Sequence, residues 1–74
     1  MTTSPDFSKL KDSWGAPFVA RECIGRFSGG LVHRRTLANL DSRGQGPDGK
    51  FKIGRKVGYP VESVVEWLES RAAE

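Results

Sequence analysis

The strongest constraint on this chain is the stretch 31–59, where a basic segment with helical spacing leads through a Gly/Pro break into a basic segment with strand spacing. In the first segment, Leu37 and Leu40 fall on one side of a helical wheel, and polar or cationic side chains fall on the other. This spacing predicts a helix that begins after the turn at Gly30 and ends at Gly44, a natural left-handed C-cap. Such a helix packs on one side and leaves hydrogen-bond donors free on the other.

The free side of this helix carries residue types that suit a nucleic acid. Arginine suits guanine and phosphate, asparagine suits adenine, and serine is permissive. An ordinary solvated helix face also carries such residues, so that alternative stays open, and only the neighbouring hairpin favours binding over it. The candidate DNA-binding residues of the helix are Arg34, Arg35, Thr36, Asn39, Ser42 and Arg43.

The second segment alternates apolar and basic residues with a period of two, which predicts a β-hairpin. A two-residue loop would pair Ile53 with Lys56 and put the two apolar sets on opposite faces. A three-residue loop pairs Ile53 with Val57 and gives one wholly apolar face, so we expect the three-residue loop. The candidate DNA-binding residues of the hairpin are Lys52, Arg55 and Lys56. The alternative is that these charges protect a sheet edge against aggregation.

Charge is distributed unevenly along the 74 residues. The segment 21–56 holds nine basic and three acidic side chains, a formal balance of +6, whereas 57–74 holds one basic and four acidic side chains. A basic centre followed by an acidic tail fits an anionic polymer that docks on one side.

Length and composition argue against several classes of protein. The chain is one small domain with a modest core, and we expect it not to be an enzyme because no nucleophile, base or carboxylate pair comes together. Cys23 and His33 are the only cysteine and histidine, so we expect no disulfide, no metal site and no cofactor. We see no signal peptide and no long apolar run, which predicts a cytoplasmic protein without membrane contact.

The remaining segments complete the expected architecture. We expect an N-terminal arm, partly disordered, over 1–17, and a DNA-binding domain over 18–74. A first helix is predicted over 18–27, followed by a Gly-containing turn at 28–30 and, after Pro60, a last helix with an acidic outer face. The predicted core consists of Val19, Cys23, Ile24, Phe27, Leu37, Leu40, Phe51, Ile53, Val57, Val64, Val65 and Leu68, with Leu31 and Val32 in the angle between the first two helices.

The run from Thr36 to Arg71 resembles the small winged helix-turn-helix proteins of phages and integrative elements. These are the excisionases, or recombination directionality factors, and the AlpA-type regulators, which are distant relatives of MerR-type DNA-binding domains. The likeness covers roughly 18–71 and differs from the common pattern in the linker 45–49. Its cues are Thr36-Leu37, Gly44-x-Gly46-Pro47, Lys52-Ile53-Gly54-Arg55, Tyr59 and Trp67-Leu68.

The resemblance implies an α+β fold of the small winged helix-turn-helix type, with the second helix in the major groove of double-stranded DNA. It also implies an excisionase that bends attachment-site DNA and assists an integrase in excising a mobile element, with cooperative self-association on DNA as a further expectation. A prophage-type transcriptional regulator is the nearest alternative. An alternative of another class is a small protein-interaction adaptor that binds a partner through Trp14, Trp67 and the acidic last helix.

Overall fold

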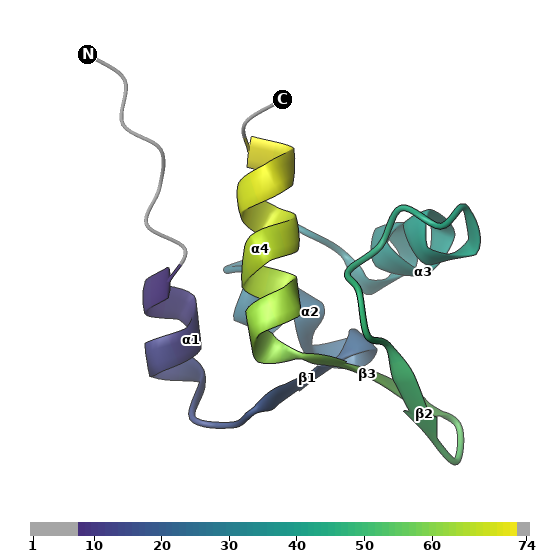
Figure 1. Cartoon of the computed structure of the whole chain (residues 1–74), viewed down its shortest axis with the longest axis horizontal. Coiled ribbons are helices and arrows are strands. Elements are labelled where there is room, and N and C mark those ends of the chain that lie inside the picture. The colour runs from purple at the N-terminus through teal and green to yellow at the C-terminus, as the bar shows by residue number, and fades with distance from the viewer. Residues whose placement is uncertain (1–7, 73–74) are drawn as a thin grey trace.

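The computed structural model describes residues 8–72, which form four α-helices, one 3-10 turn and one three-stranded antiparallel sheet. This bears out the α+β class. Figure 1 shows α4 in the middle of the molecule, α1 on one side of it, and α3 together with the β2–β3 hairpin on the other. In chain order the elements are α1 (Ser8–Trp14), β1 (Phe18–Ala20), the 3-10 turn η1 (Arg21–Cys23), α2 (Ile24–Phe27), α3 (Arg34–Ser42), β2 (Phe51–Ile53), β3 (Lys56–Pro60) and α4 (Val61–Ala72).

The segment 18–27 begins as a strand, so the single helix predicted there is wrong over its first three residues. Val19 pairs with Tyr59 and Ala20 pairs with Gly58, which makes β1 one edge of a sheet with the order β1-β3-β2. The apolar spacing that suggested a helix fits both structures, because Val19 is a β-branched residue that a strand accommodates equally well. Helical structure follows only in η1 and α2.

The hairpin turn contains two residues, Gly54 and Arg55, so the expected three-residue loop is wrong. Ile53 pairs with Lys56 and Phe51 pairs with Gly58. Gly54 has a φ of +61°, as a type II′ turn requires at its first central position. A one-residue change of register moves every side chain of a strand to the opposite face of the sheet. Ile53 therefore lies on the outer face and is 72% exposed.

Gly58 explains why this register is stable. A Cβ atom at this position would lie 2.9 Å from the Phe51 ring, so the ring packs directly over the glycine. The same ring contacts Phe18 edge to face, with centroids 5.1 Å apart. Phe51 is therefore held on the outer face of the sheet, and the expectation that it and Ile53 belong to the core is wrong.

The helix α3 is the one that the sequence predicts. At its N-terminus the Nδ1 atom of His33 accepts a hydrogen bond from the backbone N–H of Arg35 at 3.1 Å. At its C-terminus Gly44 has a φ of +73°, and the N–H of Gln45 donates to the carbonyl of Leu40 at 2.8 Å. This is the hydrogen bond of a Schellman motif, and it confirms the predicted end at Gly44.

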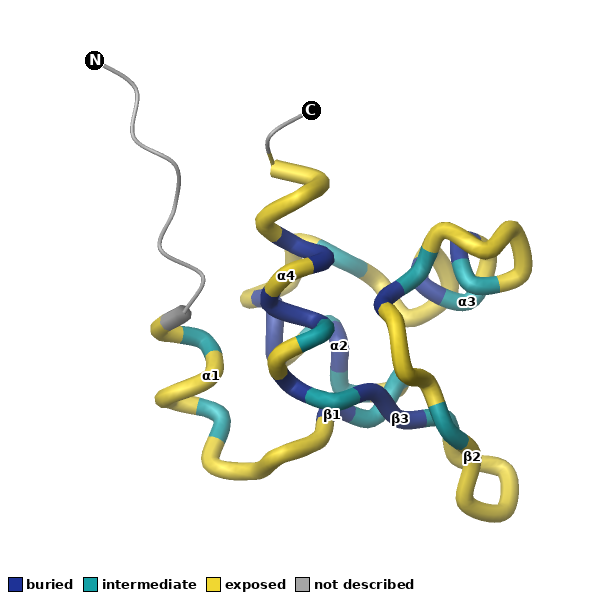
Figure 2. Tube along the Cα trace, in the orientation of Figure 1, coloured by how far each residue is buried: buried dark blue, intermediate teal, exposed yellow. Residues whose placement is uncertain are grey.

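The core lies between the sheet, α2, α3 and α4, as the buried segments in Figure 2 show. It consists of Val19, Ile24, Phe27, Leu37, Leu40, Tyr59, Val61, Val64, Val65, Trp67 and Leu68. Cys23 and Val57 are only half-buried, contrary to expectation. Leu31, expected between two helices, is 77% exposed in the turn before α3. Tyr59, Val61 and Trp67 are core residues that the predicted core did not include.

The segment 8–14, expected within an irregular arm, is the helix α1, and residues 1–7 lie outside the described part of the chain. α1 packs beside α4, where Lys11 Nζ lies 3.7 Å from a Glu62 carboxylate oxygen. Trp14 contacts the Phe27 ring edge to face, with centroids 5.2 Å apart. Among residues 8–72, no helix has the length and apolar character needed to cross a membrane.

Candidate functional site

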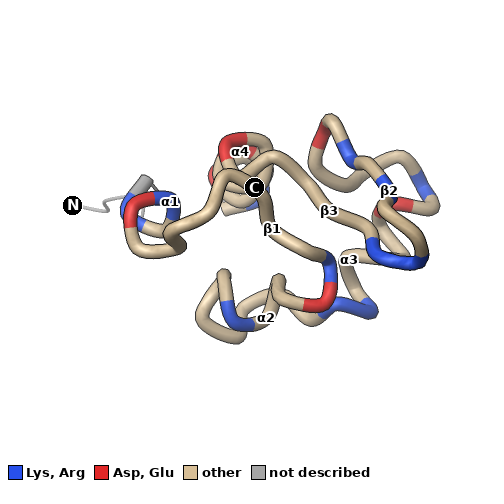
Figure 3. Tube along the Cα trace, turned by 90° about the horizontal axis from the view of Figure 1, so that it is seen from below, with Lys and Arg blue, Asp and Glu red and all other residues tan. Residues whose placement is uncertain are grey.

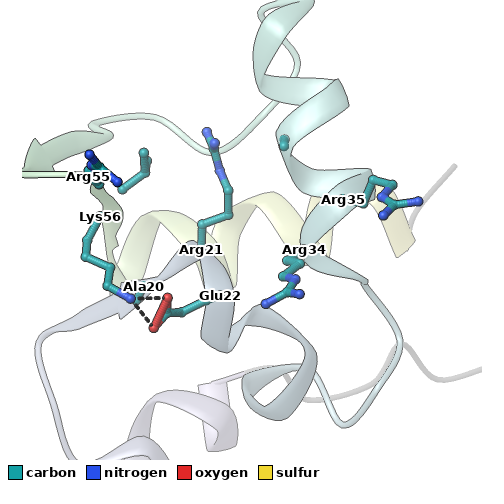
Figure 4. A pocket seen from close by; sticks show the side chains of 9 residues that line it. Ala20, Arg21, Glu22, Arg34, Arg35, Arg55 and Lys56 are labelled. Atoms are coloured by element: carbon teal, nitrogen blue, oxygen red, sulfur yellow. Dashed lines mark hydrogen bonds and ion pairs between the residues drawn. The ribbon is translucent and has the colours of Figure 1, made fainter.

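A hollow of about 310 Å³ lies between α3, η1 and the β2–β3 hairpin. Figure 4 shows the side chains that line it, which come from three segments far apart in the sequence. Ala20, Ala38 and Val57 contribute apolar side chains, and most of the other lining residues are cations. Among the residues that the structure describes, the lining consists of Ala20, Arg21, Glu22, Arg34, Arg35, Ala38, Arg55, Lys56 and Val57.

Positive charge is concentrated around this hollow. Five of its nine lining residues are Arg or Lys, and Glu22 is the one acidic residue among them. Figure 3 shows the basic positions of η1, α3 and the hairpin gathered on one part of the molecule, while acidic positions of α4 lie elsewhere. A concave surface lined by one sign of charge focuses the electric field and attracts ligands of the opposite sign.

The six candidate residues of α3 and its C-cap lie on different sides of the helix. Arg34 and Arg35 line the hollow, whereas the other four do not. On the helical wheel Asn39 lies with Arg35 on the side opposite the buried Leu37 and Leu40. Ser42 shares that side, and its Oγ donates a hydrogen bond to the carbonyl of Asn39 at 2.7 Å. The donor-bearing face is therefore free of contacts with the core.

The three candidate residues of the hairpin are also separated by the structure. Arg55 in the turn and Lys56 at the start of β3 line the hollow. Lys52 does not line it, and because it pairs with Val57 its side chain lies on the opposite face of the hairpin from Ile53 and Lys56. Lys56 is not free in the turn as expected, because its Nζ atom lies 2.5 and 2.9 Å from the two carboxylate oxygens of Glu22.

A polar cluster of Arg21, Asp41 and Tyr59 joins η1, α3 and β3, and Arg21 also lines the hollow. Arg21 donates to the Tyr59 hydroxyl at 3.0 Å and to Asp41 Oδ2 at 2.7 Å, and the Tyr59 hydroxyl donates to the same carboxylate oxygen. Gly46 packs tightly on this cluster, since a Cβ atom there would overlap the Asp41 carboxylate at 1.9 Å. These contacts fix the distance between α3 and the hairpin.

The sequence could not identify this cluster. Arg21 is separated by 20 residues from Asp41 and by 38 from Tyr59, so no spacing rule connects them. From the sequence, Asp41 is predicted only to pair with a nearby charge. Arg21 is predicted either to bind phosphate or to be solvated. In the sequence, only the family likeness draws attention to Gly46. The structure gives the physical reason for a glycine at this position, which is its close approach to Asp41.

Tyr59 is expected to ionise at unusually high pH. Burial, together with its hydrogen bond to Asp41, raises the pKa of its phenol to about 12. Because the chain has a single tyrosine, the ultraviolet absorbance of tyrosinate reports this group alone. An alkaline titration should therefore show ionisation well above the ordinary value of about 10. A midpoint near the ordinary value in the folded protein would contradict the buried cluster.

The raised pKa of Tyr59 also predicts how stability depends on pH. The folded state retains the phenolic proton at pH values where the unfolded chain has lost it. The contribution of this group is therefore complete below about pH 10 and is lost as the pH rises to about 12. Chemical denaturation across this window should show a steeper loss of stability for the wild type than for Tyr59→Phe.

Both tryptophans are used within the fold. Trp67 is buried, and its Nε1 donates to the carbonyl of Gln45 at 2.7 Å. Trp14 is half-buried, and its Nε1 donates to the carbonyl of Phe18 at 2.8 Å. By contrast, Phe18 is 53% exposed on the outer face of the sheet, beside Phe51. The sequence did not indicate exposed aromatic residues on a sheet.

No protein-family model matches this chain, and no curated protein is similar enough to count as a relative.

Proposed function

We propose that this protein binds double-stranded DNA as a winged helix-turn-helix module, with α3 in the major groove and the β2–β3 hairpin as the wing on the flanking backbone. The observation that carries the proposal is the hollow between α3 and the hairpin, to which three separate segments contribute Arg or Lys. A duplex presents a helix-sized groove bordered by phosphates. An exposed helix beside a basic hairpin matches this arrangement, because the helix can enter the groove while the hairpin contacts the phosphates at its border.

The free face of α3 supplies the residues for reading bases. Arg35 and Asn39 lie on the side opposite the buried leucines, where their side chains are available to a ligand. In this proposal Arg35 contacts guanine or phosphate and Asn39 contacts adenine. Arg34 and Arg55, on opposite sides of the hollow, contact phosphates, which position the protein without reading sequence.

The family likeness is what supports a more specific biological role for this DNA binding. We propose an excisionase that bends attachment-site DNA and acts with an integrase, in the compartment that holds the DNA. A transcriptional regulator uses the same surface, and the two roles differ in whether excision requires the protein. The adaptor alternative has less support, because Trp67 is buried and Trp14 packs against Phe27.

Removing the phosphate-contacting arginines should reduce the salt dependence of binding. Each phosphate that a side chain neutralises contributes ~0.9 to the slope of log affinity against log salt on B-form DNA. The double variant Arg34→Ala/Arg55→Ala should therefore have a slope smaller by ~0.9 for each phosphate that it no longer neutralises. It should bind all duplexes more weakly by a similar factor, because both arginines act independently of sequence. Fluorescence anisotropy of a labelled duplex at several salt concentrations measures both quantities.

The matched control is Lys9→Ala/Lys11→Ala, which removes the same charge from α1, far from the hollow. Its slope should stay close to that of the wild type. A single strand should also be compared, because Phe18 and Phe51 offer an exposed surface on which bases could stack. Equal slopes for both double variants, or tighter binding of the single strand, would overturn the proposal.

A further inference from the structure

Among the described residues that line the hollow, Glu22 alone carries a charge of the wrong sign for an anionic ligand. Its two oxygens lie 2.5 and 2.9 Å from the single ammonium of Lys56, so both oxygens share one cation. Figure 4 shows this ion pair bridging η1 and the hairpin across one side of the hollow. Arg34 lines the same hollow, and its side chain extends into the region next to Glu22.

This carboxylate is ionised at neutral pH. Its hydrogen bonds to Lys56 lower the pKa of Glu22 below the ordinary value, and the positive charges of Lys56 and Arg34 act in the same direction. Two oxygens of a carboxylate held between cations have the shape and charge of two phosphate oxygens. Glu22 therefore occupies the place beside Lys56 that a backbone phosphate would take if one strand of a duplex ran along the hollow.

The ion pair does little for the fold. The Lys56 side chain is 67% exposed and that of Glu22 is 46% exposed. Exposed pairs of this kind contribute little to stability, because water screens the attraction. The hairpin is fixed instead by its pairing with β1 through β3 and by the contact of Phe51 with Gly58. A phosphate can consequently replace Glu22 without unfolding the site.

We propose that Glu22 is a built-in competitor of DNA phosphate: it neutralises Lys56 in the free protein and must be displaced when a duplex binds. This inference rests on the proposed DNA binding and adds what limits its affinity, which is the competition between Glu22 and phosphate for Lys56. An ordinary interface residue weakens binding when it is removed, whereas removal of Glu22 strengthens it. The effect is the same on all duplexes, because phosphates carry no sequence information.

The test is Glu22→Gln, which keeps the size of the side chain and removes its charge. Affinity for a duplex at low salt should increase roughly three- to tenfold, since phosphate no longer competes with a carboxylate for Lys56. The slope of log affinity against log salt should become steeper by up to ~0.9, because in the wild type the displaced carboxylate stays beside the duplex and retains a cation that Glu22→Gln does not. Thermal melting should stay near that of the wild type.

Two comparisons separate this effect from a general change of net charge. Asp48→Asn removes one exposed negative charge that does not line the hollow, and it should change affinity much less. In a Lys56→Ala background, Glu22→Gln should lose most of its effect, because the cation for which Glu22 competes is absent.

The outcomes distinguish this inference from the proposed function. If the wild type binds duplex DNA but Glu22→Gln binds equally or more weakly, the competitor role is wrong and DNA binding stands. An equal gain in both backgrounds also overturns the competitor role. If neither the wild type nor Glu22→Gln binds duplex DNA at low salt, the proposed function fails first, and this inference fails with it.

Discussion

Replacement of Leu37 by alanine should destabilise the protein by about 2–5 kcal/mol, the usual cost of a large-to-small substitution in a packed core. Leu37 is fully buried and belongs to the cluster formed by α3, the sheet and α4. A chain of this length has a total stability of about 4–11 kcal/mol at the typical value per residue. The loss is a large fraction of this stability, so the melting temperature should fall well below that of the wild type. Thermal or chemical denaturation followed by circular dichroism measures the change.

The matched control is Thr36→Ala, one residue earlier in the same helix. Thr36 is exposed, and alanine favours helix, so this variant should melt close to the wild type or slightly above it. Equal stability of Leu37→Ala and Thr36→Ala would show that α3 does not pack on the core as described. Because α3 presents the candidate DNA-binding residues, that result would also undermine the proposed site.

Asp41→Ala should produce the second large effect, about 3 kcal/mol of destabilisation, at the lower end of the range for breaking a buried ion pair. The Asp41 side chain is 5% exposed, whereas that of Arg21 is 27% exposed, so water can partly compensate the arginine that remains. Without the carboxylate, the Tyr59 hydroxyl loses its acceptor and Gly46 loses the group packed against it. Denaturation measures the loss of stability.

The same variant should weaken DNA binding beyond its effect on stability, because the cluster fixes α3 relative to the hairpin. Tyr59→Phe is the milder variant, since it removes one hydroxyl and keeps the pair between Arg21 and Asp41. Asp48→Ala, a change of an exposed acid, serves as the control. An Asp41→Ala protein as stable as Asp48→Ala would contradict the buried cluster.

Local signals in the sequence predicted the elements that are stabilised locally. The helix α3 was predicted correctly because its apolar stripe and its Gly44 cap lie within one short segment. The last helix was predicted for the same reason, with Pro60 immediately before Val61. The grouping of basic charge was also visible, although nothing in the spacing indicates which cations meet in one hollow.

Contacts between distant segments determine those parts of the fold and of the candidate site that could not be predicted from the sequence. Phe18–Ala20 form a strand only because β3 offers a partner 38–42 residues later in the chain. The hairpin register depends on the Phe51 ring fitting over Gly58, a contact that outweighs the wholly apolar face expected from alternation. Glu22 and Lys56 are 34 residues apart, so their ion pair within the candidate site was equally hidden.

The most direct test of the proposed DNA binding maps the contact surface residue by residue. Amide resonances of the isotope-labelled protein are recorded by NMR while a short duplex is added at low salt. We predict that the perturbed amides cluster in α3 and in the hairpin around Arg55, while the exposed positions of α4 stay unchanged. Perturbations confined to α1 and α4, or no perturbation at any duplex concentration, would contradict the proposal that this surface binds DNA.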